Sequence, residues 1–412
     1  MDQQYRLFVG IDWAKNEHTI CVLDSKQKVI ERRTIEHSGT GLGQLFDLLT
    51  RLSASDAASV AVAIETPRGA VVESLIERGF AVYSLNPKQM DRFRDRHSVA
   101  GAKDDRRDAF VLADALRTDR HLFHQARLDD PLVIRLRELS RTEEDIQHEQ
   151  VRIGHQLREL LNRYYPEMLK LCPGVDEPWF WDLLELRPQP IAGAKLPKSK
   201  IQRLLQSHRI RRLDANDIEE ALSVPALKLA PGAAEAASEH ALLILPILRL
   251  LRQQRKEMVR RIEAQLKQMS TEGEYSGHRD VTILRSVEGL GRVIIATMLG
   301  EASQPLAERD YHAFRSYGGT APITRQSGKR RSVQMRKSCN QRLRNAIYHW
   351  ARVSTQCDPR SKKHYEELRA KGHSHGRALR GVADRLLAML ISMLKSGTTY
   401  DPEKREQPTV ED

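Results

Sequence analysis

Four carboxylates in the first third of the chain have the types and spacing of a metal site. Asp12 ends a β-rich run, VGID, and Glu65 ends a later one, AVAIE. Asp105 and Asp108 lie three residues apart in a predicted helix and so share one of its faces. Strand ends of an α/β sheet meet at one edge, where the four carboxylates can converge. Such a cluster needs a neutralising cation, and hard oxygen ligands favour Mg²⁺ or Mn²⁺, which serve two-metal phosphodiester chemistry.

Each of these residues also has a simpler interpretation. An Asp near a strand end is usually a turn former, and a run of Asp and Arg is usually a solvated helix face. Asp104 is also one helical turn from Asp108, so a site that uses Asp104 instead of Asp105 stays open. Asp114, two turns further along, is expected to lie outside the site.

A second candidate site is strongly basic and contains a serine. Residues 315–345 include nine Arg or Lys and no Asp or Glu, which by itself indicates a phosphate-binding face. Ser327, beside Gly328, is a candidate nucleophile that would need nearby cations and a base or metal to attack a phosphodiester. Ser332 and Ser338 are the fallback candidates. The side chains predicted to bind nucleic acid are Arg325, Lys329, Arg330, Arg331, Arg336, Lys337, Arg342 and Arg344.

The first 120 or so residues have the pattern of an α/β domain. Residues 5–33 contain three short β-rich runs separated by polar breaks, which predicts three adjacent strands. A helix is predicted around 41–52, then a buried strand SVAVAIE, a helix after Pro67, a short strand FAVYSL and more helix.

The rest of the chain is predicted to be mainly helical. Long amphipathic patterns cover 130–165 and 233–269 and predict an antiparallel coiled coil whose tip is formed by 172–232, a segment to which we assign no function. Residues 281–301 resemble a helix-hairpin-helix, whose turn can offer N–H groups to a phosphate. A Gly-rich basic loop is predicted to follow Tyr317 and to lead into a helix from about 340.

Composition favours a nucleic-acid partner. Lys and Arg exceed Asp and Glu by 67 to 55, a net charge of +12, and the isoelectric point is near 9.6. The four cysteines form no C-x-x-C pair, so neither a zinc ribbon nor a disulfide framework is indicated, and a reducing cytoplasm fits. The start, MDQQYR, is not a signal core, and no run reaches the roughly 18 apolar residues of a membrane span. We expect a soluble, intracellular protein without a membrane partner.

Both candidate sites resemble one protein family. The order GIDWAK, AIETP and KDDRRDAFVLADAL resembles a RuvC-like (RNase H-like) nuclease domain and the N-terminal half of DEDD-type insertion-sequence transposases, relatives of pilin-gene invertases. The segments TAPITRQSGKRR and NQRLRNAIYHWA look like the C-terminal transposase domain of that family, whose QSG loop carries the catalytic serine. The matching positions are Asp12, Glu65, Asp105, Asp108 and Ser327. Two departures are Asp104, where an uncharged residue is usual, and Cys339 in place of a glycine.

The resemblance implies a mechanism and partners. Its members most similar to this chain are guided by a bridge RNA that pairs with donor and target DNA. By this analogy, Ser327 forms a phosphoserine link to DNA while the carboxylates hold Mg²⁺, and homodimers assemble into tetramers with composite sites. The implied domains are a RuvC-like domain at 1–125, a helical coiled-coil region at 126–275, a transposase domain at 276–398 and a disordered tail at 399–412. A bacterial, nucleoid-associated location follows.

Other functions remain open from the sequence. A RuvC-like nuclease or junction resolvase would cleave with water, and an unguided invertase would read DNA directly. VGIDWAK could also begin an actin-like kinase, but no Gly-rich second phosphate loop follows. A non-enzymatic scaffold would pair its carboxylates with arginines. His373 and His375 are expected to be surface residues, because no further ligands lie nearby in the sequence.

Overall fold

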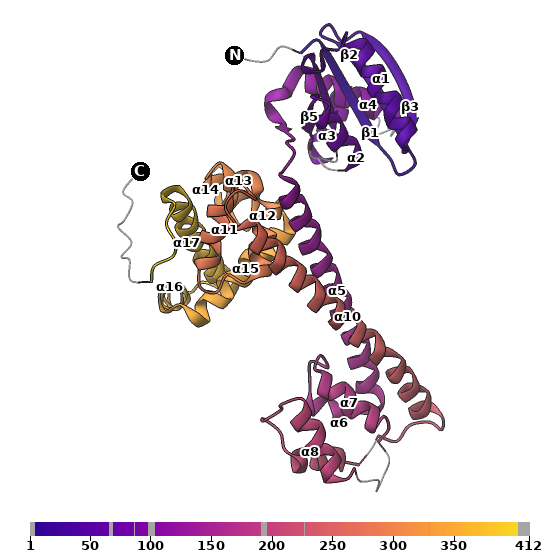
Figure 1. Ribbon diagram of the computed structural model, residues 1–412, viewed down its shortest axis with the longest axis vertical. Coiled ribbons are helices and arrows are strands. Elements are labelled where there is room, and N and C mark those ends of the chain that lie inside the picture. Colours follow the sequence, from indigo (N-terminus) through magenta and orange to yellow (C-terminus); the bar gives the residue numbers. More distant parts are fainter. Residues whose placement is uncertain are drawn as a thin grey trace. The chain divides into compact units, whose positions relative to one another are not determined.

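The chain folds into two compact units, Met1–Asp129 and Asp130–Asp412 (Figure 1). The computed structural model describes residues 5–65, 69–85, 87–97, 104–190, 196–225, 227–328 and 330–402. None of the helices in these ranges is long and apolar enough to cross a membrane.

The first unit is built on a mixed six-stranded sheet. Its strands are β1 (Leu7–Trp13), β2 (Glu17–Asp24), β3 (Val29–Glu36), β4 (Val60–Ile64), β5 (Ala81–Ser84) and β6 (His124–Gln125), in the spatial order β3-β2-β1-β4-β5-β6. β1 pairs antiparallel with β2 and parallel with β4, and β5 runs parallel to β4. The three predicted N-terminal strands are therefore confirmed, and the topology is consistent with a RuvC-like domain.

Helices cover both faces of this sheet. Alternate residues of β1 enter different cores, because successive side chains of a strand point to opposite faces. Val9 and Ile11 pack with α1 (Gly39–Leu52) and α2 (Ala70–Glu77). Phe8 packs on the other face, with α3 (Pro87–His97) and α4 (Asp105–Asp119). Short 3-10 turns at Ala57–Ser59 and Arg120–Leu122 complete the unit.

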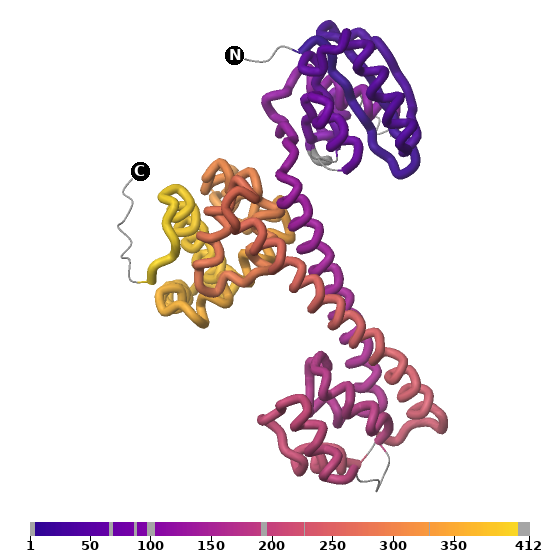
Figure 2. Tube along the Cα trace, in the orientation of Figure 1, coloured from indigo at the N-terminus to yellow at the C-terminus, as the bar shows by residue number. Residues whose placement is uncertain are grey.

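Two long helices dominate the second unit. α5 (Pro131–Tyr164) and α10 (Ala233–Met269) lie side by side for much of their length (Figure 2). Arg255 Nε donates to Glu143 Oε1 at 2.6 Å, and Gln156 lies 3.3 Å from His240. Since residue numbers rise along one helix as they fall along the other, the pair is antiparallel.

The segment between these helices forms a small helical subdomain. It contains α6 (Pro166–Leu171), α7 (Pro178–Leu186), α8 (Lys198–Ser207) and α9 (Ala215–Leu222). The aromatic run of Trp179, Phe180 and Trp181 is almost completely buried in a core shared with α5 and α10. Residues 172–232, which sequence composition left without an assignment, therefore include a packed structural element.

A third core joins the start of α5 and the end of α10 to helices of the C-terminal part, whose elements follow in chain order. These are α11 (His278–Ser286), α12 (Arg292–Glu301), α13 (Ser303–Ala307), α14 (Tyr311–Tyr317), β7 (Ile323–Ser327), β8 (Arg330–Gln334), α15 (Gln341–Cys357), α16 (Pro359–Ala370) and α17 (His375–Ser396). α11 and α12 are joined by a turn in which Gly289 has a φ of +77°.

Two details of the C-terminal prediction are corrected by the structure. The expected basic loop after Tyr317 contains the β7–β8 hairpin, whose strands are joined by a tight turn at Gly328 with a positive φ. The expected disordered tail begins too early, since Tyr400 packs on the third core and its backbone N–H donates to Ser286 Oγ at 2.8 Å. Residues 403–412 lie outside the described part.

Candidate active site

Asp12 and Glu65 are positioned by adjacent parallel strands. Asp12 is the penultimate residue of β1, and Glu65 directly follows β4, the strand beside it. Both side chains are half-buried. The sheet thus brings together two carboxylates that are 53 positions apart in the sequence, as the strand-end argument predicts.

Gly10 allows α4 to approach β1 closely enough to bring in the other two carboxylates. A Cβ atom at Gly10 would lie 1.9 Å from the carbonyl oxygen of Ala109 and 2.6 Å from the backbone nitrogen of Ala113. No side chain fits there, so the helix backbone rests on the strand. Sequence reasoning did not identify Gly10, although a glycine inside a buried strand is a signal of close backbone approach.

Asp105 and Asp108 lie in the first turn of α4, where the helix dipole favours negative charge. Asp108 is 1% exposed, whereas Asp105 is exposed. Asp104 is the N-cap residue and accepts a hydrogen bond from the backbone of Arg106 at 3.2 Å. The carboxylate of Asp104 thus satisfies a helix end, which supports Asp105 as the member of the tetrad.

The pKa of Asp12 reflects the three other carboxylates of the predicted set. Burial and then the charges of Asp108, Asp105 and Glu65 raise the pKa of Asp12 to about 6, against a partial lowering by Arg94. Like charges gathered in this way disfavour ionisation, which is the condition that a bound cation relieves.

Arg94 in α3 is a member of the cluster that the sequence did not predict. Its guanidinium donates to both oxygens of Asp108, from Nε at 2.6 Å and from Nη2 at 2.8 Å. Nη2 also lies 3.7 Å from Glu65 Oε1, and Nη1 donates to Asp91 at 2.7 Å. No motif marks Arg94 in the sequence, because only the fold places α3 beside α4.

The donor set fits a hard divalent cation, with one rearrangement. All four groups offer carboxylate oxygens, which Mg²⁺ and Mn²⁺ prefer. No three of the four bring these oxygens within 4.8 Å of one another, since the Arg94 cation lies among them. Asp114 lies outside the cluster, as predicted: it is buried and bonded to Arg117 at 2.7 Å.

Among the described residues, one group has ligand atoms within 4.8 Å of one another, namely Cys172, Asp176 and Glu177. Glu177 accepts hydrogen bonds from Arg212 at 2.5 Å and Trp179 Nε1 at 2.8 Å, and burial raises the pKa of the Cys172 thiol. These contacts explain the group as part of the subdomain core. His375 bonds to Tyr365 at 2.8 Å, and His373 joins no described ligand group.

Ser327 lies at the tip of the hairpin in the second unit. It ends β7 and pairs with Arg330, the first residue of β8, across a two-residue turn in which Gly328 has a φ of +56°. The left-handed backbone at that position suits glycine. Ser327 is exposed, and no described residue hydrogen-bonds its hydroxyl. The hydroxyl is exposed as expected, but the element that exposes it is a hairpin and not the predicted loop.

The register divides the basic side chains between two faces of the hairpin. Residues i and i+2 share a face and directly paired residues share a face, so Arg325, Arg330 and Ser332 lie on the face of Ser327. Arg331 pairs with Gln326 and lies on the opposite face. Among the described residues of the hairpin, Arg330 and Arg325 are therefore the cations that share the face of Ser327.

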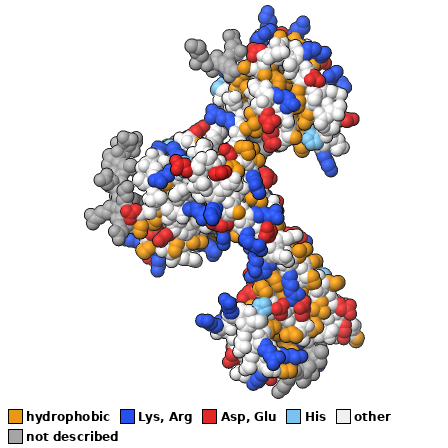
Figure 3. All heavy atoms as spheres, viewed as in Figure 1, with side chains coloured by type: hydrophobic (Ala, Val, Ile, Leu, Met, Phe, Trp, Pro, Cys, Tyr) orange, Lys and Arg blue, Asp and Glu red, His pale blue; other side chains and the backbone are white. Residues whose placement is uncertain are grey.

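The other side chains predicted to bind nucleic acid differ in their exposure and in whether they already form ion pairs. Lys337 is exposed, whereas Arg336 and Arg344 are half-buried. Arg342 forms ion pairs with Glu144 and, at 2.7 Å, with Asp145 on α5. Lys329 lies outside the described residues. Over the molecular face in Figure 3, basic and acidic side chains are interspersed rather than gathered in one block.

The chain matches two transposase family models and proteins of bacterial insertion elements. Residues 9–166 match a transposase family of the DEDD type, and residues 281–366 match the transposase IS116/IS110/IS902 family. The mini-circle transposase for IS117 of Streptomyces coelicolor is 32% identical over 412 residues, which covers 98% of each chain. A Sinorhizobium fredii protein with a transposase name is 45% identical over 216 residues, covering 52% of this chain and 60% of that protein. The chain therefore belongs to the IS116/IS110/IS902 family of DNA transposases.

Proposed function

We propose that this transposase cuts and rejoins DNA through a covalent link to Ser327, with a divalent cation held by Asp12, Glu65, Asp105 and Asp108. The observation that carries the proposal is an exposed serine at the tip of a basic hairpin, in a family member whose other unit places three carboxylates close enough to Asp12 to raise its pKa. A passive scaffold would also pair carboxylates with arginines, as Asp108 is paired with Arg94, but it has no need of an exposed serine among cations.

In the proposed reaction, the Oγ atom of Ser327 attacks a DNA phosphorus. A bond forms between Oγ and phosphorus while the bond from phosphorus to the 3′ oxygen breaks, which leaves a 3′ hydroxyl. The serine proton passes to a base, and the leaving oxygen gains a proton. Attack of another 3′ hydroxyl on the phosphoserine reverses these changes and rejoins the strand. Arg325 and Arg330, on the serine's face, stabilise the charge on the phosphate.

Mg²⁺, or Mn²⁺ in its place, would supply Lewis-acid stabilisation of the phosphate oxygens and lower the pKa of a coordinated hydroxyl. The protein's own contribution is to hold the carboxylates on a rigid strand and helix. Asp108 is fixed by burial, and Asp12 is fixed by its place in β1 beneath α4.

The covalent step has a direct test. The protein is incubated with end-labelled donor and target DNA and Mg²⁺, denatured, and resolved by electrophoresis. Wild type is expected to give a protein–DNA adduct, and Ser327→Ala none, with DNA binding retained. Ser332→Ala and Ser338→Ala are matched controls that keep the adduct. An adduct that survives Ser327→Ala would reassign the nucleophile, and cleavage by wild type without any adduct would favour a RuvC-like nuclease or resolvase.

The carboxylate assignment is tested in the same assay. Asp12→Asn and Asp105→Asn are expected to abolish the metal-dependent cleavage, whereas Asp104→Asn should retain it because asparagine also caps a helix. Cleavage that depends on Asp104 and not on Asp105 would shift the site by one residue.

We also propose that a bridge RNA guides the reaction and that the protein acts at the bacterial nucleoid. The resemblance of the sequence motifs supports this, together with the net charge of +12, since a guide delegates sequence recognition to base pairing. The test is to express the protein with its flanking noncoding DNA and to sequence the RNA that copurifies. A single structured RNA from the flanks is expected. Random RNA or none would favour an unguided, invertase-like enzyme.

An exposed apolar stripe on α10 supports assembly into homodimers and tetramers. Leu243, Ile247 and Leu250 are 72%, 45% and 53% exposed and recur at positions i, i+4 and i+7 of one helix face. A second copy would bury this stripe. The double variant Leu243→Gln and Leu250→Gln is expected to lower the mass measured by light scattering. An unchanged mass would place the interface elsewhere.

A further inference from the structure

A cavity of about 260 Å³ lies at the base of the β7–β8 hairpin. Its walls come from the turn after α14, from Met335 just after β8, and from α15 and α17. Gly319, with a φ of +72°, contributes bare backbone there, and a Cβ at that position would lie 2.7 Å from Cys339 Sγ. None of the expected catalytic residues lines this cavity.

The cavity contains two arginines without an acidic partner among the described residues. Arg380 is half-buried, and its guanidinium Nη1 lies 3.3 Å from the thioether sulfur of Met335, a weak acceptor. Burial and then the nearby charge of Arg377 lower the pKa of Arg380. Arg344, on α15, lies 4.0 Å from Cys339 Sγ, again a weak acceptor. Desolvated cations without counter-charges favour an anionic ligand.

The rest of the cavity suits a flat, apolar group with polar edges. Ile347, Leu379 and Met335 provide apolar contact, and Tyr348 is a partly exposed aromatic ring at its border. Asn345 adds an amide that can donate and accept hydrogen bonds. Aromatic and apolar walls with an amide and cations are the features that proteins use for unstacked nucleotides.

From these features we infer that the cavity binds one unstacked nucleotide of a single-stranded nucleic acid, with its base against Tyr348 and its phosphate on Arg380 and Arg344. This inference deepens the proposed function. The strand β8 leads from Met335 to Arg330 beside Ser327, a span of roughly 17 Å for five residues. A nucleotide held at the base of the hairpin would therefore fix the strand that reaches the serine at its tip.

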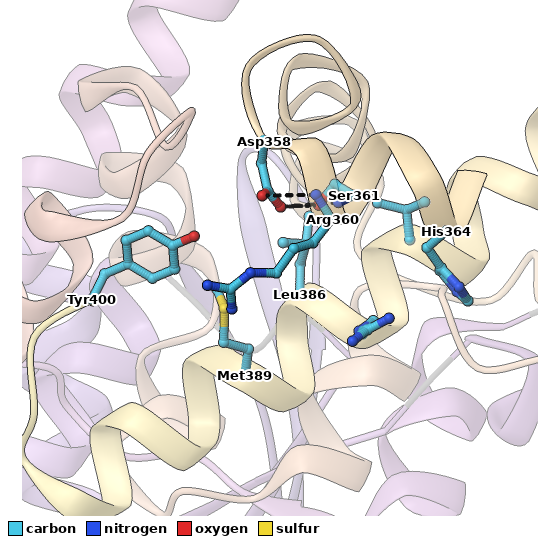
Figure 4. Close-up of a pocket in the computed structure, with 9 residues that line it drawn as sticks. Asp358, Arg360, Ser361, His364, Leu386, Met389 and Tyr400 are labelled. Atoms are coloured by element: carbon cyan, nitrogen blue, oxygen red, sulfur yellow. Dashed lines mark hydrogen bonds between the residues drawn. The ribbon is translucent and has the colours of Figure 1, made fainter. Parts of the chain in front are cut away.

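A second cavity in the same unit lacks the features of a nucleotide site. It lies among α16, α17 and Tyr400 (Figure 4) and has a volume of about 20 Å³, room for about one water molecule. Its carboxylate, Asp358, accepts hydrogen bonds from the backbone of Arg360 and Ser361 at 3.1 Å and thereby caps α16. This cavity is a satisfied packing feature and is not a nucleotide site.

The test measures binding by the full chain in a Ser327→Ala background, so that no cleavage interferes. The probes are fluorescein-labelled 12-mers of deoxythymidine and of uridine, with a 12-base-pair duplex DNA for comparison, followed by anisotropy. Tyr348→Ala and Arg380→Gln are each expected to weaken single-strand binding by about tenfold, the effect of losing one stacked base or one phosphate contact. Duplex affinity should change less than about twofold.

Arg352→Gln is the matched control, because Arg352 is exposed on α15, the helix of Tyr348, and does not line the cavity. It should weaken single-strand and duplex binding by the same small factor. Thermal melting checks that the variants are folded, and Tyr348→Phe should restore binding. The inference is overturned if Tyr348→Ala has no effect, if single-strand and duplex affinities fall equally, or if wild type does not bind single strands.

The two probes identify the source of the nucleotide. If the Tyr348→Ala and Arg380→Gln variants lose affinity only for the deoxythymidine 12-mer, the cavity binds the DNA strand. If they lose affinity only for the uridine 12-mer, the cavity binds RNA. The outcome is separable from that of the proposed reaction, because the binding assay does not need the Ser327 hydroxyl. A wild type that binds single strands through Tyr348 but forms no adduct would remove the serine mechanism and keep the nucleotide site.

Discussion

Arg94 binds Asp108 through two charge-assisted hydrogen bonds, with Nε to Oδ1 at 2.6 Å and Nη2 to Oδ2 at 2.8 Å. Asp108 is buried, so a cation must accompany its charge. Arg94 supplies that charge in this structure, and it lies near the carboxylates that a divalent ion would use. Arg94 and the metal are therefore expected to compete.

Removing Arg94 should strengthen metal binding. We expect Arg94→Gln to raise Mn²⁺ affinity, measured by calorimetry, by about tenfold or more, since a tenfold change needs only about 1.4 kcal/mol. Arg96→Gln is the control, because Arg96 lies in the same helix and pairs with Asp119. A weaker affinity for Mn²⁺ in Arg94→Gln would show instead that Arg94 orients Asp108 for the metal.

The raised pKa of Asp12 predicts a stability difference that depends on pH. A carboxyl with a pKa near 3.8 when unfolded and about 6 when folded lowers the free energy of unfolding progressively as pH rises from about 4 to about 6, and the full cost is present above about 6. In EDTA at pH 8, Asp12→Asn should raise the free energy of unfolding by about 1 to 3 kcal/mol. The gain should shrink as pH falls from 7 to 5.

Denaturant titrations across this pH range measure the effect. Asp104→Asn should show no comparable gain, since Asp104 is exposed and caps α4. A gain from Asp12→Asn that is the same at pH 5 and pH 8 would mean that the carboxylates do not act on Asp12.

Gly10→Ala is expected to disrupt both the fold and the metal site. The added methyl would meet the backbone of Ala109 and Ala113, which cannot move without displacing α4. We expect a loss of about 1 to 3 kcal/mol or more in the free energy of unfolding, together with weaker Mn²⁺ binding. Gly43→Ala is the control: no atom lies within 4 Å of its added methyl, and it should stabilise α1 by about 0.5 to 1 kcal/mol. Equal stability of the two variants would contradict the close approach.

Arg342 and Arg330 should differ in what their removal changes. Arg342 joins α15 to α5 through Glu144 and Asp145, so Arg342→Ala should lower the melting temperature. Arg330, exposed beside Ser327, should leave the melting temperature unchanged. Arg330→Ala should instead reduce the slope of log affinity for DNA against log salt by about 1. A salt slope that falls only for Arg342→Ala would reverse these roles.

The identities and order of the chemical groups could be predicted from the sequence. The strand ends at Asp12 and Glu65, the helical spacing of Asp105 and Asp108, and Ser327 beside a glycine in a basic stretch are local patterns with local physical causes. The strands of the first unit and the two long helices follow from periodicity in the same way.

Only the tertiary structure decided which charges meet. Arg94 lies beside the carboxylates because α3 packs on α4. Arg342 forms an ion pair with Asp145 of α5, which lies 197 residues away in the sequence. No repeating pattern in the sequence marks either contact, because each joins two elements that core packing brings together. The pairing of β7 with β8 likewise decided which arginines share a face with Ser327, because the side-chain alternation of a hairpin depends on its register.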